Sequence, residues 1–291
     1  MLTFSALFWA GNAIVGRALK DHVDAIDMNL IRWTLALLIM LPFVYRSIQS
    51  EYTTIFKHWR IISILGLLGI ASFQVFLYLA LQTTAVVNAL LLLSLCPVLI
   101  FIGNMVFYRE LPSPKASIGI AVSLLGVLTV ISHGEIDVLK NFAFGIGDFW
   151  MLLASSTWAA YSIALRSKPK TISQLHMLFS SAVVGVIALS VAGLVVTSTS
   201  VVAEWDISTY LSLAYLAFVP SVLAFICWNR GVELLGANQA GGFLHLIPLF
   251  GAFLSLILLA EKLAFYHLVG ALLIFAGIAL TSNIKFNNRN K

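Results

Sequence analysis

Long, unbroken apolar segments limit what this chain of 291 residues can fold into more than any other feature. They run for about 20 residues each, which is the length that an α-helix needs to cross the hydrocarbon core of a bilayer. Only 10% of the residues are charged and the mean hydropathy is +0.99, whereas about 25% of the residues of a soluble domain are charged. The sequence therefore predicts an all-α integral membrane protein.

Windows of about 19 residues place ten predicted transmembrane helices, and the short linkers between them hold nearly all of the charge. The predicted ranges are 3–19, 26–46, 60–80, 85–107, 115–132, 148–166, 174–197, 208–230, 236–259 and 264–283. The first segment lacks the basic start and the cleavage site of a secretory signal, so it is interpreted as a retained helix. No soluble domain is expected between the spans.

Basic residues are distributed unequally between the two sides of a ten-span arrangement. Twelve of the 17 Lys and Arg residues fall on one side and four on the other, while Arg32 lies within a span. Because basic loops stay in the cytoplasm, this bias predicts a multi-pass membrane protein with both termini cytoplasmic. The net charge of +5 reflects topology, and a nucleic-acid partner is not expected.

Landmark residues recur in the second half of the chain at one offset of 151 residues. The matched pairs are Pro97 and Pro248, Glu110 and Glu261, Gly119 and Gly270, and Gly126 and Gly277. Trp9 and Trp158 match at an offset of 149. Because each half holds an odd number of predicted helices, five, the second copy must be inverted. Residues 1–133 and 145–283 are therefore predicted to be two inverted repeats, an arrangement in which secondary transporters bind substrate near the bilayer midplane.

Three stretches carry a family resemblance: Phe8 to Asn12, Pro97 through Arg109-Glu110-Leu111 to Gly126, and the repeat of the second stretch from Pro248 through Glu261-Lys262-Leu263 to Gly277. In their order, spacing and duplication they resemble the EamA family of the drug/metabolite transporter (DMT) superfamily. The resemblance covers essentially the whole chain. It implies a ten-helix inner-membrane transporter, usually an exporter of amino acids, related metabolites or toxic compounds, with a central cavity between the halves. It does not imply which substrate.

Aromatic and polar side chains inside the spans are the candidates for substrate binding, because polar groups are costly in hydrocarbon and face protein or water. Trp9 and Asn12 share one face of the first predicted helix, and Trp158 with the adjacent Tyr161 repeats this pattern in the sixth. Such faces suit an amphipathic or aromatic solute. The alternative is helix packing together with an interfacial aromatic belt.

Gln74 and Tyr78 lie at i, i+4 spacing and present an amide and a phenol on one helix face. We favour a role in lining the cavity over hydrogen bonds that only hold the helices together. Trp228, beside Asn229, occupies the corresponding region of the second half, closer to a membrane face. For Trp228, cavity lining and an aromatic belt stay open as alternatives.

Ser94 and His245 occupy equivalent positions, each three residues before a proline, Pro97 or Pro248. A proline frees the carbonyl four residues earlier and can bend the helix, so each proline is a candidate hinge beside a binding point. His245 can titrate near neutral pH, which makes it the candidate for proton coupling or for contact with a carboxylate. The favoured alternative is a neutral histidine bonded to a neighbouring carbonyl or serine.

Two further sets of charged residues stand near or within spans. Arg32 has two interpretations, contact with a substrate carboxylate or, preferred here, snorkelling or pairing with Asp27 or Asp148 near the outer surface. Glu110 and Glu261 end their helices, where a carboxylate opposes the helix dipole. Their repetition predicts pairing with a neighbouring helix end, as a gate or packing clamp.

Several functions are disfavoured by what the sequence lacks. Cys96 and Cys227 lie inside apolar segments at no metal-binding or redox spacing, so no metal or cofactor is expected. No paired carboxylates or activated nucleophile indicate an enzyme. The preferred function is export of amino acids or related metabolites by alternating access, with multidrug efflux or import of a metabolite as alternatives. A monomer is expected, and proton coupling and facilitated exchange are both left open.

Overall fold

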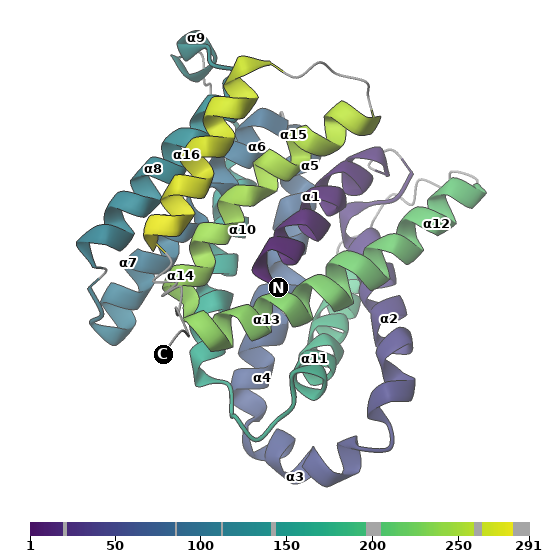
Figure 1. Ribbon diagram of the computed structural model, residues 1–291. Coiled ribbons are helices and arrows are strands. Elements are labelled where there is room, and N and C mark those ends of the chain that lie inside the picture. Colours follow the sequence, from purple (N-terminus) through teal and green to yellow (C-terminus); the bar gives the residue numbers. More distant parts are fainter. Residues whose placement is uncertain are drawn as a thin grey trace, which may run out of the picture.

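The computed structural model describes residues 1–19, 22–84, 86–111, 113–140, 144–195, 205–258 and 264–281, and within these ranges the chain forms helices and no strand. Figure 1 shows the helices packed around one another in a single bundle.

The helices before residue 141 are α1 (Leu2–Ala18), α2 (Ala25–Val44), α3 (Ile48–Lys57), α4 (Trp59–Leu65), the π-helix η1 (Gly66–Ser72), α5 (Phe73–Thr83), α6 (Val86–Leu93), α7 (Cys96–Tyr108), α8 (Pro114–Ile131) and α9 (Ile136–Lys140). The later helices are α10 (Ile146–Ala164), the 3₁₀-helix η2 (Leu165–Ser167), α11 (Gln174–Val195), α12 (Ile207–Leu216), the π-helix η3 (Ala217–Leu223), α13 (Ala224–Leu235), α14 (Ala237–Gly242), the 3₁₀-helix η4 (Phe243–His245), α15 (Leu246–Leu258) and α16 (Phe265–Thr281).

Six helical segments of the described residues are long and apolar enough to cross a bilayer. They are Ala25–Val44, Trp59–Thr83, Ala89–Tyr108, Pro114–Ile131, Gln174–Leu194 and Ile207–Leu235, and the shorter Leu2–Gly16 and Phe265–Thr281 are also apolar. Large apolar side chains on these helices point outward, among them Phe43, Phe107 and Leu194 at 71%, 76% and 85% exposure. The chain is thus a multi-pass helical membrane protein, and the count of ten spans and their inversion stay predictions.

The segment between Arg46 and Arg60, predicted as a linker, contains the short helix α3. Its Tyr52 and Phe56 are one helical turn apart and exposed, while the carboxylate of Glu51 lies 2.9 Å from His176 Nδ1 at the start of α11. A short helix with aromatic side chains on one face is typical of the membrane–water interface. In Figure 1, α3 lies across one end of the bundle.

Two of the predicted spans are interrupted at corresponding places, just before a proline. Ser94 and Leu95 separate α6 from α7 ahead of Pro97, and η4 separates α14 from α15 ahead of Pro248. Proline has no N–H to donate, so the regular α pairing fails on its N-terminal side. The backbone carbonyls there are open to donors from other helices.

The π-helices η1 and η3 also correspond, because each bound of η3 lies 151 residues after that of η1. Where α pairing changes to π pairing the hydrogen-bond ladder is irregular, and side chains can bond to its carbonyls. Asn29 Nδ2 donates to the Ile70 carbonyl of η1 at 3.0 Å, and Trp9 Nε1 donates to the Pro220 carbonyl of η3 at 3.2 Å. Both π-helices therefore hold side chains of neighbouring helices in place.

The helices α8 and α16 lie side by side (Figure 1) and pack with their glycines in contact. A Cβ atom added to Gly119 would lie 2.6 Å from the carbonyl oxygen of Gly277, and one added to Gly126 would lie 2.7 Å from that of Gly270. Because the earlier glycine of α8 faces the later glycine of α16, the two helices are antiparallel. These small residues let the two helix backbones approach closely.

The two halves of the chain interlock. The helix α1 packs against α13 and α15 of the second half, while α10 packs against α5, α6 and α7 of the first. In the same way α2 packs on η3, and α11 packs on η1. Most of the predicted binding residues lie in the core between these crossing helices.

Candidate functional site

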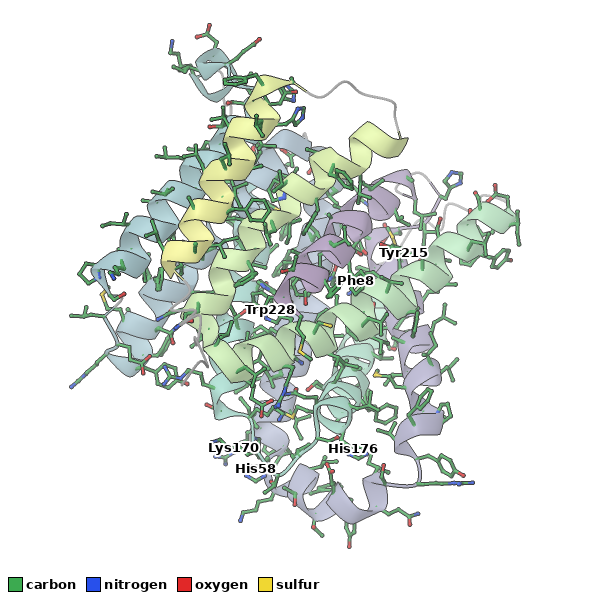
Figure 2. All side chains as sticks on the ribbon, in the orientation of Figure 1. Phe8, His58, Lys170, His176, Tyr215 and Trp228 are labelled. Atoms are coloured by element: carbon green, nitrogen blue, oxygen red, sulfur yellow. The ribbon has the colours of Figure 1, made fainter. Side chains whose placement is uncertain are left out.

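A cluster of aromatic rings fills the centre of this core. Trp9 meets Trp158 edge to face with 4.8 Å between ring centroids, and both rings contact Trp228, at 5.4 Å and 5.6 Å. Tyr161 stacks on Trp158 at 5.0 Å. All four side chains are buried, and Figure 2 shows Trp228 near the middle of the bundle. The predicted aromatic faces of α1 and α10 thus meet, and Trp228 joins them rather than an interfacial belt.

An apolar cavity opens beside this cluster. The residues that line it are Trp9, Asn12, Ala13, Phe73, Leu77, Leu81, Ala89, Leu90, Leu93, Met151, Trp158, Leu244 and Ile247. Both halves contribute, and among these residues Asn12 alone carries an amide. The cavity therefore offers contact area to an apolar or aromatic group and a hydrogen bond at one point.

A second, polar cavity lies toward the other end of the same helices. Its lining residues are Asn104, Glu110, Leu165, Arg166, Lys168, Lys170, Asn229, Val232, Glu233, Leu235, Gly236, Ala237, Asn238 and Gln239. Along α10 and η2, Met151 and Trp158 face the apolar cavity and Leu165 faces the polar one. Figure 2 shows Lys170 at one end of the bundle, away from Trp228.

Tyr161 connects the two cavities. Its ring stacks on Trp158, which lines the apolar cavity, and its hydroxyl donates to Asn229 Oδ1, which lines the polar cavity, at 2.7 Å. A matching bond joins Tyr78 of α5 to Asn12 of α1 at 3.2 Å. In the first half the asparagine lies on α1 and the tyrosine on α5. In the second half the tyrosine lies on α10 and the asparagine on α13.

Arg32 of α2 is fully buried, and its guanidinium is surrounded by neutral oxygen atoms. Nη1 donates to Asn12 Oδ1 at 3.0 Å, to Gln74 Oε1 at 3.2 Å and to Tyr78 Oη at 2.6 Å. Nε and Nη2 donate to Ser221 Oγ of η3 at 2.9 Å and 2.7 Å. The preferred sequence interpretation, pairing near the outer surface, is wrong for Arg32.

Ser94 and His245 lie against each other behind the wall of the apolar cavity. His245 Nε2 lies 2.9 Å from the Ser94 carbonyl oxygen, and Nδ1 lies 2.6 Å from Ser123 Oγ of α8. The neighbouring Leu93 and Leu244 line the cavity. These contacts agree with the favoured alternative, in which the histidine is bonded to a neighbouring carbonyl or serine. The roles of Ser94 and His245 in binding substrate or protons stay predictions.

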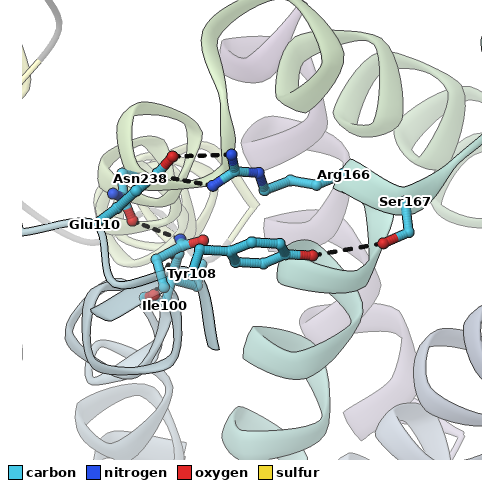
Figure 3. A network of polar contacts seen from close by, with 7 residues as sticks. Ile100, Tyr108, Glu110, Arg166, Ser167 and Asn238 are labelled. Carbon is cyan, nitrogen blue, oxygen red and sulfur yellow. Dashed lines mark hydrogen bonds and ion pairs between the residues drawn. The ribbon is translucent and has the colours of Figure 1, made fainter. Parts of the chain in front are cut away.

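Glu110 pairs with Arg166 at the mouth of the polar cavity (Figure 3). The helix α7 ends at Tyr108, and the left-handed backbone of the capping residue Arg109 (φ 55°) turns the chain sharply. The Glu110 carboxylate then accepts two hydrogen bonds from Arg166, at 2.5 Å and 2.9 Å. These bonds hold the pKa of Glu110 below its ordinary value. Glu110 thus contacts the end of a neighbouring helix as expected, and Glu261 lies outside the described residues.

Two more contacts join α7 to the second half beside this ion pair. The Arg166 guanidinium stacks over the Tyr108 ring at 4.2 Å, and Asn104 Nδ2 donates to Asn238 Oδ1 of α14 at 2.7 Å. Figure 3 shows these groups in one network. We call Asn104, Tyr108, Glu110, Arg166 and Asn238 the clamp.

The nine predicted binding residues are thus brought to one region of the core but not to one surface. Trp9, Asn12 and Trp158 line the apolar cavity. Gln74 and Tyr78 do not line it but bond to Arg32, and Tyr78 also bonds to Asn12. Tyr161 and Trp228 contact the Trp158 ring. Ser94 and His245 lie behind the cavity wall. Sequence reasoning gave little weight to Arg32 and missed Ser221, whose position depends on the π-helix.

Helices long and apolar enough to cross a membrane, with cavities between the interlocking halves, define a polytopic membrane protein. The sequence profile of the EamA-like transporter family matches residues 1–132 and 145–283. The chain therefore belongs to the EamA-like transporter family.

The relatives support this assignment. The chain is 26% identical over 232 residues to the uncharacterized transporter YyaM of Bacillus subtilis, covering 78% of this chain and 76% of that protein. It is 25% identical over 285 residues to an uncharacterized transporter of Archaeoglobus fulgidus, covering 97% and 96%. It is 26% identical over 187 residues to a "probable amino-acid metabolite efflux pump" of Escherichia coli, covering 62% and 61%.

One solved crystal structure has the same fold. It superimposes on this chain with a TM-score of 0.74, covering 96% of this chain and 94% of the other at 17% identity. At this identity the likeness concerns the fold alone.

Proposed function

We propose that this chain is an inner-membrane secondary transporter that exports amino acids or related small metabolites by alternating access. The observation that carries the proposal is the pair of cavities at opposite ends of the same helices, divided at Trp158 and Tyr161. A solute that crosses the membrane needs an approach from each side and a barrier between them. The name of the E. coli relative supports amino-acid metabolites as the substrate class.

The proposed architecture has ten transmembrane helices in two inverted repeats, residues 1–133 and 145–283, with both termini in the cytoplasm. Three observations support the inversion. The π-helices η1 and η3 correspond at an offset of 151 residues, α8 packs antiparallel to α16 through matched glycines, and Ser94 bonds to the residue that corresponds to it, His245. A two-fold axis in the membrane plane would produce such self-matching contacts. Since both repeats already enclose the cavities, a monomer is the proposed working unit.

Alternating access also needs parts that move. We assign the clamp, with Glu110, to the cytoplasmic gate, and the helix interruptions before Pro97 and Pro248 to the hinges. The basic residues Arg166, Lys168 and Lys170 around the polar cavity lie on the side that the charge bias makes cytoplasmic. Export would then begin at the polar cavity and pass the aromatic cluster.

Multidrug efflux of cations and enzymatic activity are less well supported. Cation antiport normally uses a carboxylate within the membrane. Asp148, the buried carboxylate in α10, lies at the helix start, where it accepts hydrogen bonds from Thr84 Oγ1 and the Gly145 N–H, at 2.7 Å and 2.8 Å. Membership in a transporter family favours transport over catalysis.

Counterflow in liposomes tests the proposal. Liposomes that contain the purified protein are loaded with one unlabelled amino acid. Uptake of labelled aromatic and small polar amino acids is then measured with and without a pH gradient. Saturable exchange of at least one class is the expected result, and dependence on the gradient would assign protons as coupling ions. The absence of exchange for every amino acid by folded protein would contradict the proposal, while exchange of dyes or cations alone would favour multidrug efflux.

Cysteine labelling tests the pathway independently. After replacement of Cys96 and Cys227, single cysteines at Asn12, Ala13 and Leu77 should react with water-soluble thiol reagents in at least one conformation. Resistance at all three positions in every condition would contradict the assignment of the apolar cavity to the solute path.

A further inference from the structure

We propose that Arg32 binds the carboxylate of the transported solute, so that the substrates are solutes with a free carboxylate beside an apolar or aromatic group. This inference rests on the proposed function and specifies its substrate class. Four observations carry it: the charge of Arg32 without a counter-ion among the described residues, a buried donor without an acceptor on its partner Gln74, its link to the cavity, and the residue at the corresponding position of the second half.

Arg32 is a buried charge without a counter-ion in the part of the chain that the structure describes. Its side chain is 0% exposed, and among the described residues no carboxylate forms an ion pair with it. A guanidinium stays charged at physiological pH, and a buried charge with only neutral partners carries a desolvation cost that they do not fully offset. Charged residues within membrane helices are accordingly tied to function. A substrate carboxylate would supply the missing negative charge.

One partner of Arg32, Gln74, carries a buried donor without an acceptor among the described residues. Gln74 Oε1 is taken by Arg32, which leaves Gln74 Nε2 buried and, among the described residues, without an acceptor. Farther from Arg32, in the aromatic cluster, the indole N–H groups of Trp158 and Trp228 are also buried without an acceptor among the described residues. A buried donor without a partner costs about 1–3 kcal/mol. A carboxylate has only hydrogen-bond acceptors, so it would supply partners for such donors.

Asn12 connects Arg32 to the solute path. Its side chain lines the apolar cavity, and its Oδ1 accepts hydrogen bonds from both Arg32 Nη1 and Tyr78. Nη1 has two protons for three acceptors, Asn12, Gln74 and Tyr78. If a carboxylate replaced the Asn12 oxygen at Nη1, Gln74 and Tyr78 would remain as neutral acceptors for the other proton. The apolar part of the same solute would then lie against Trp9 and Trp158.

The fold itself does not demand an arginine at this place. By the offset of 149 residues that relates Trp9 to Trp158, the position corresponding to Arg32 is Ser181 of α11. The packing partners correspond as well, since α2 packs on η3 and α11 on η1. A buried serine is sufficient in the second half. The guanidinium is therefore an addition to the repeated scaffold.

Two matched ligands test the assignment: 3-phenylpropionate, and 3-phenylpropionamide, which has nearly the same shape and no charge. Each is titrated against the protein's tryptophan fluorescence and used to compete with counterflow of labelled L-phenylalanine. We expect the acid to bind at least about tenfold more tightly than the amide, as the loss of a charged hydrogen bond predicts. Equal binding of acid and amide, or no binding of the acid, would overturn the inference.

Variants separate binding from folding. In Arg32→Gln the preference for the acid should disappear, while in Arg60→Gln, an exposed arginine at the start of α4, it should persist. Because Arg32→Gln can impair folding, Gln74→Glu is the second variant. It places a carboxylate of the same shape beside Arg32, so it should raise the thermal midpoint and also abolish the preference. A Gln74→Glu protein that keeps the preference for the acid would contradict the assignment.

The two proposals fail in different ways. If amino acids exchange but the acid and the amide compete equally, the proposed transport function is supported and the proposed role of Arg32 is contradicted. If no labelled amino acid exchanges, the proposed function falls, and the fluorescence titration still decides whether Arg32 binds carboxylates.

Discussion

His245 Nε2 lies 2.9 Å from the carbonyl oxygen of Ser94, the residue that occupies the corresponding position 151 places earlier in the chain. The Ser94 carbonyl can accept this bond because Ser94 lies in the interruption between α6 and α7, just before Pro97. Ser123 of α8 lies at the other ring nitrogen. One imidazole thus joins three helices of the core, next to the leucines that line the apolar cavity.

Replacing His245 should affect stability according to the hydrogen bonds that the new side chain can form. We expect His245→Leu to lower the free energy of unfolding by about 1–2 kcal/mol, because hydrogen bonds within membrane bundles contribute roughly 0.6 kcal/mol on average and up to 1.7. His245→Gln, which can both donate and accept, should lose less. Thermal unfolding in detergent measures the difference, and equal midpoints for the two variants would contradict it.

The ion pair of Glu110 and Arg166 should depend on charge. The two side chains are partly exposed, so their pairing contributes only about 0.2–1 kcal/mol. We expect Glu110→Arg and Arg166→Glu each to weaken the clamp and to change the counterflow rate. The double exchange restores the pair and should recover most of the rate. A double variant no better than the worse single variant would exclude a gating role for this pair.

The same pair has a defined pH dependence. Arg166 lowers the pKa of Glu110 in the folded protein, so the stabilisation is fully present above the ordinary pKa of a glutamate and is lost as the pH falls through the lowered value. The difference in thermal midpoint between the wild type and Glu110→Gln should therefore persist at neutral pH and shrink in acid. Glu135→Gln, in the exposed turn after α8, is the matched control.

The contact between α8 and α16 should not tolerate a methyl group. A Cβ at position 126 would lie 2.7 Å from the Gly270 carbonyl oxygen and 2.8 Å from Ile274 N, and these backbone atoms cannot move aside. We expect Gly126→Ala to lower the free energy of unfolding by about 1–3 kcal/mol, as overpacking does. Gly193→Ala is the control, because its nearest contact would be Ile26 Cγ2 at 3.9 Å. Similar thermal midpoints for the two variants would contradict the prediction.

Local patterns predicted part of this structure, and long-range contacts decided the rest. The i, i+4 spacing of Gln74 and Tyr78 was enough to place both on one inward face, and the repeated prolines marked both helix interruptions. The position of Arg32 was not predictable in this way, because its partners Asn12 and Ser221 are 20 and 189 residues distant. The π-helix that presents Ser221 leaves no periodic pattern in the sequence, since it changes only the hydrogen-bond register.

The start of α12 is stabilised by an acidic cap that should survive mild acid. Asp206 accepts hydrogen bonds from the Thr209 N–H at 2.8 Å and from the hydroxyls of Thr209 and Ser208, and these bonds lower the pKa of Asp206 to about 2. The cap is present above the ordinary pKa of an aspartate and is lost as the pH falls through about 2. Hydrogen exchange of the first α12 amides should speed up in Asp206→Ala and change little in Asp206→Asn, which still caps a helix.

Tyr161 should control how readily solutes pass from the polar to the apolar cavity. Tyr161→Phe keeps the stacking on Trp158 but loses the bond to Asn229, and Tyr161→Ala loses both. With a single cysteine at Ala13 as reporter, we expect the rate of thiol labelling to rise about three- to tenfold in Tyr161→Phe, as the loss of one hydrogen bond predicts, and further in Tyr161→Ala. Tyr215→Phe controls for loss of a phenol elsewhere. Equal labelling rates in all backgrounds would mean that Tyr161 does not separate the cavities, and Trp158 would then be the residue to replace.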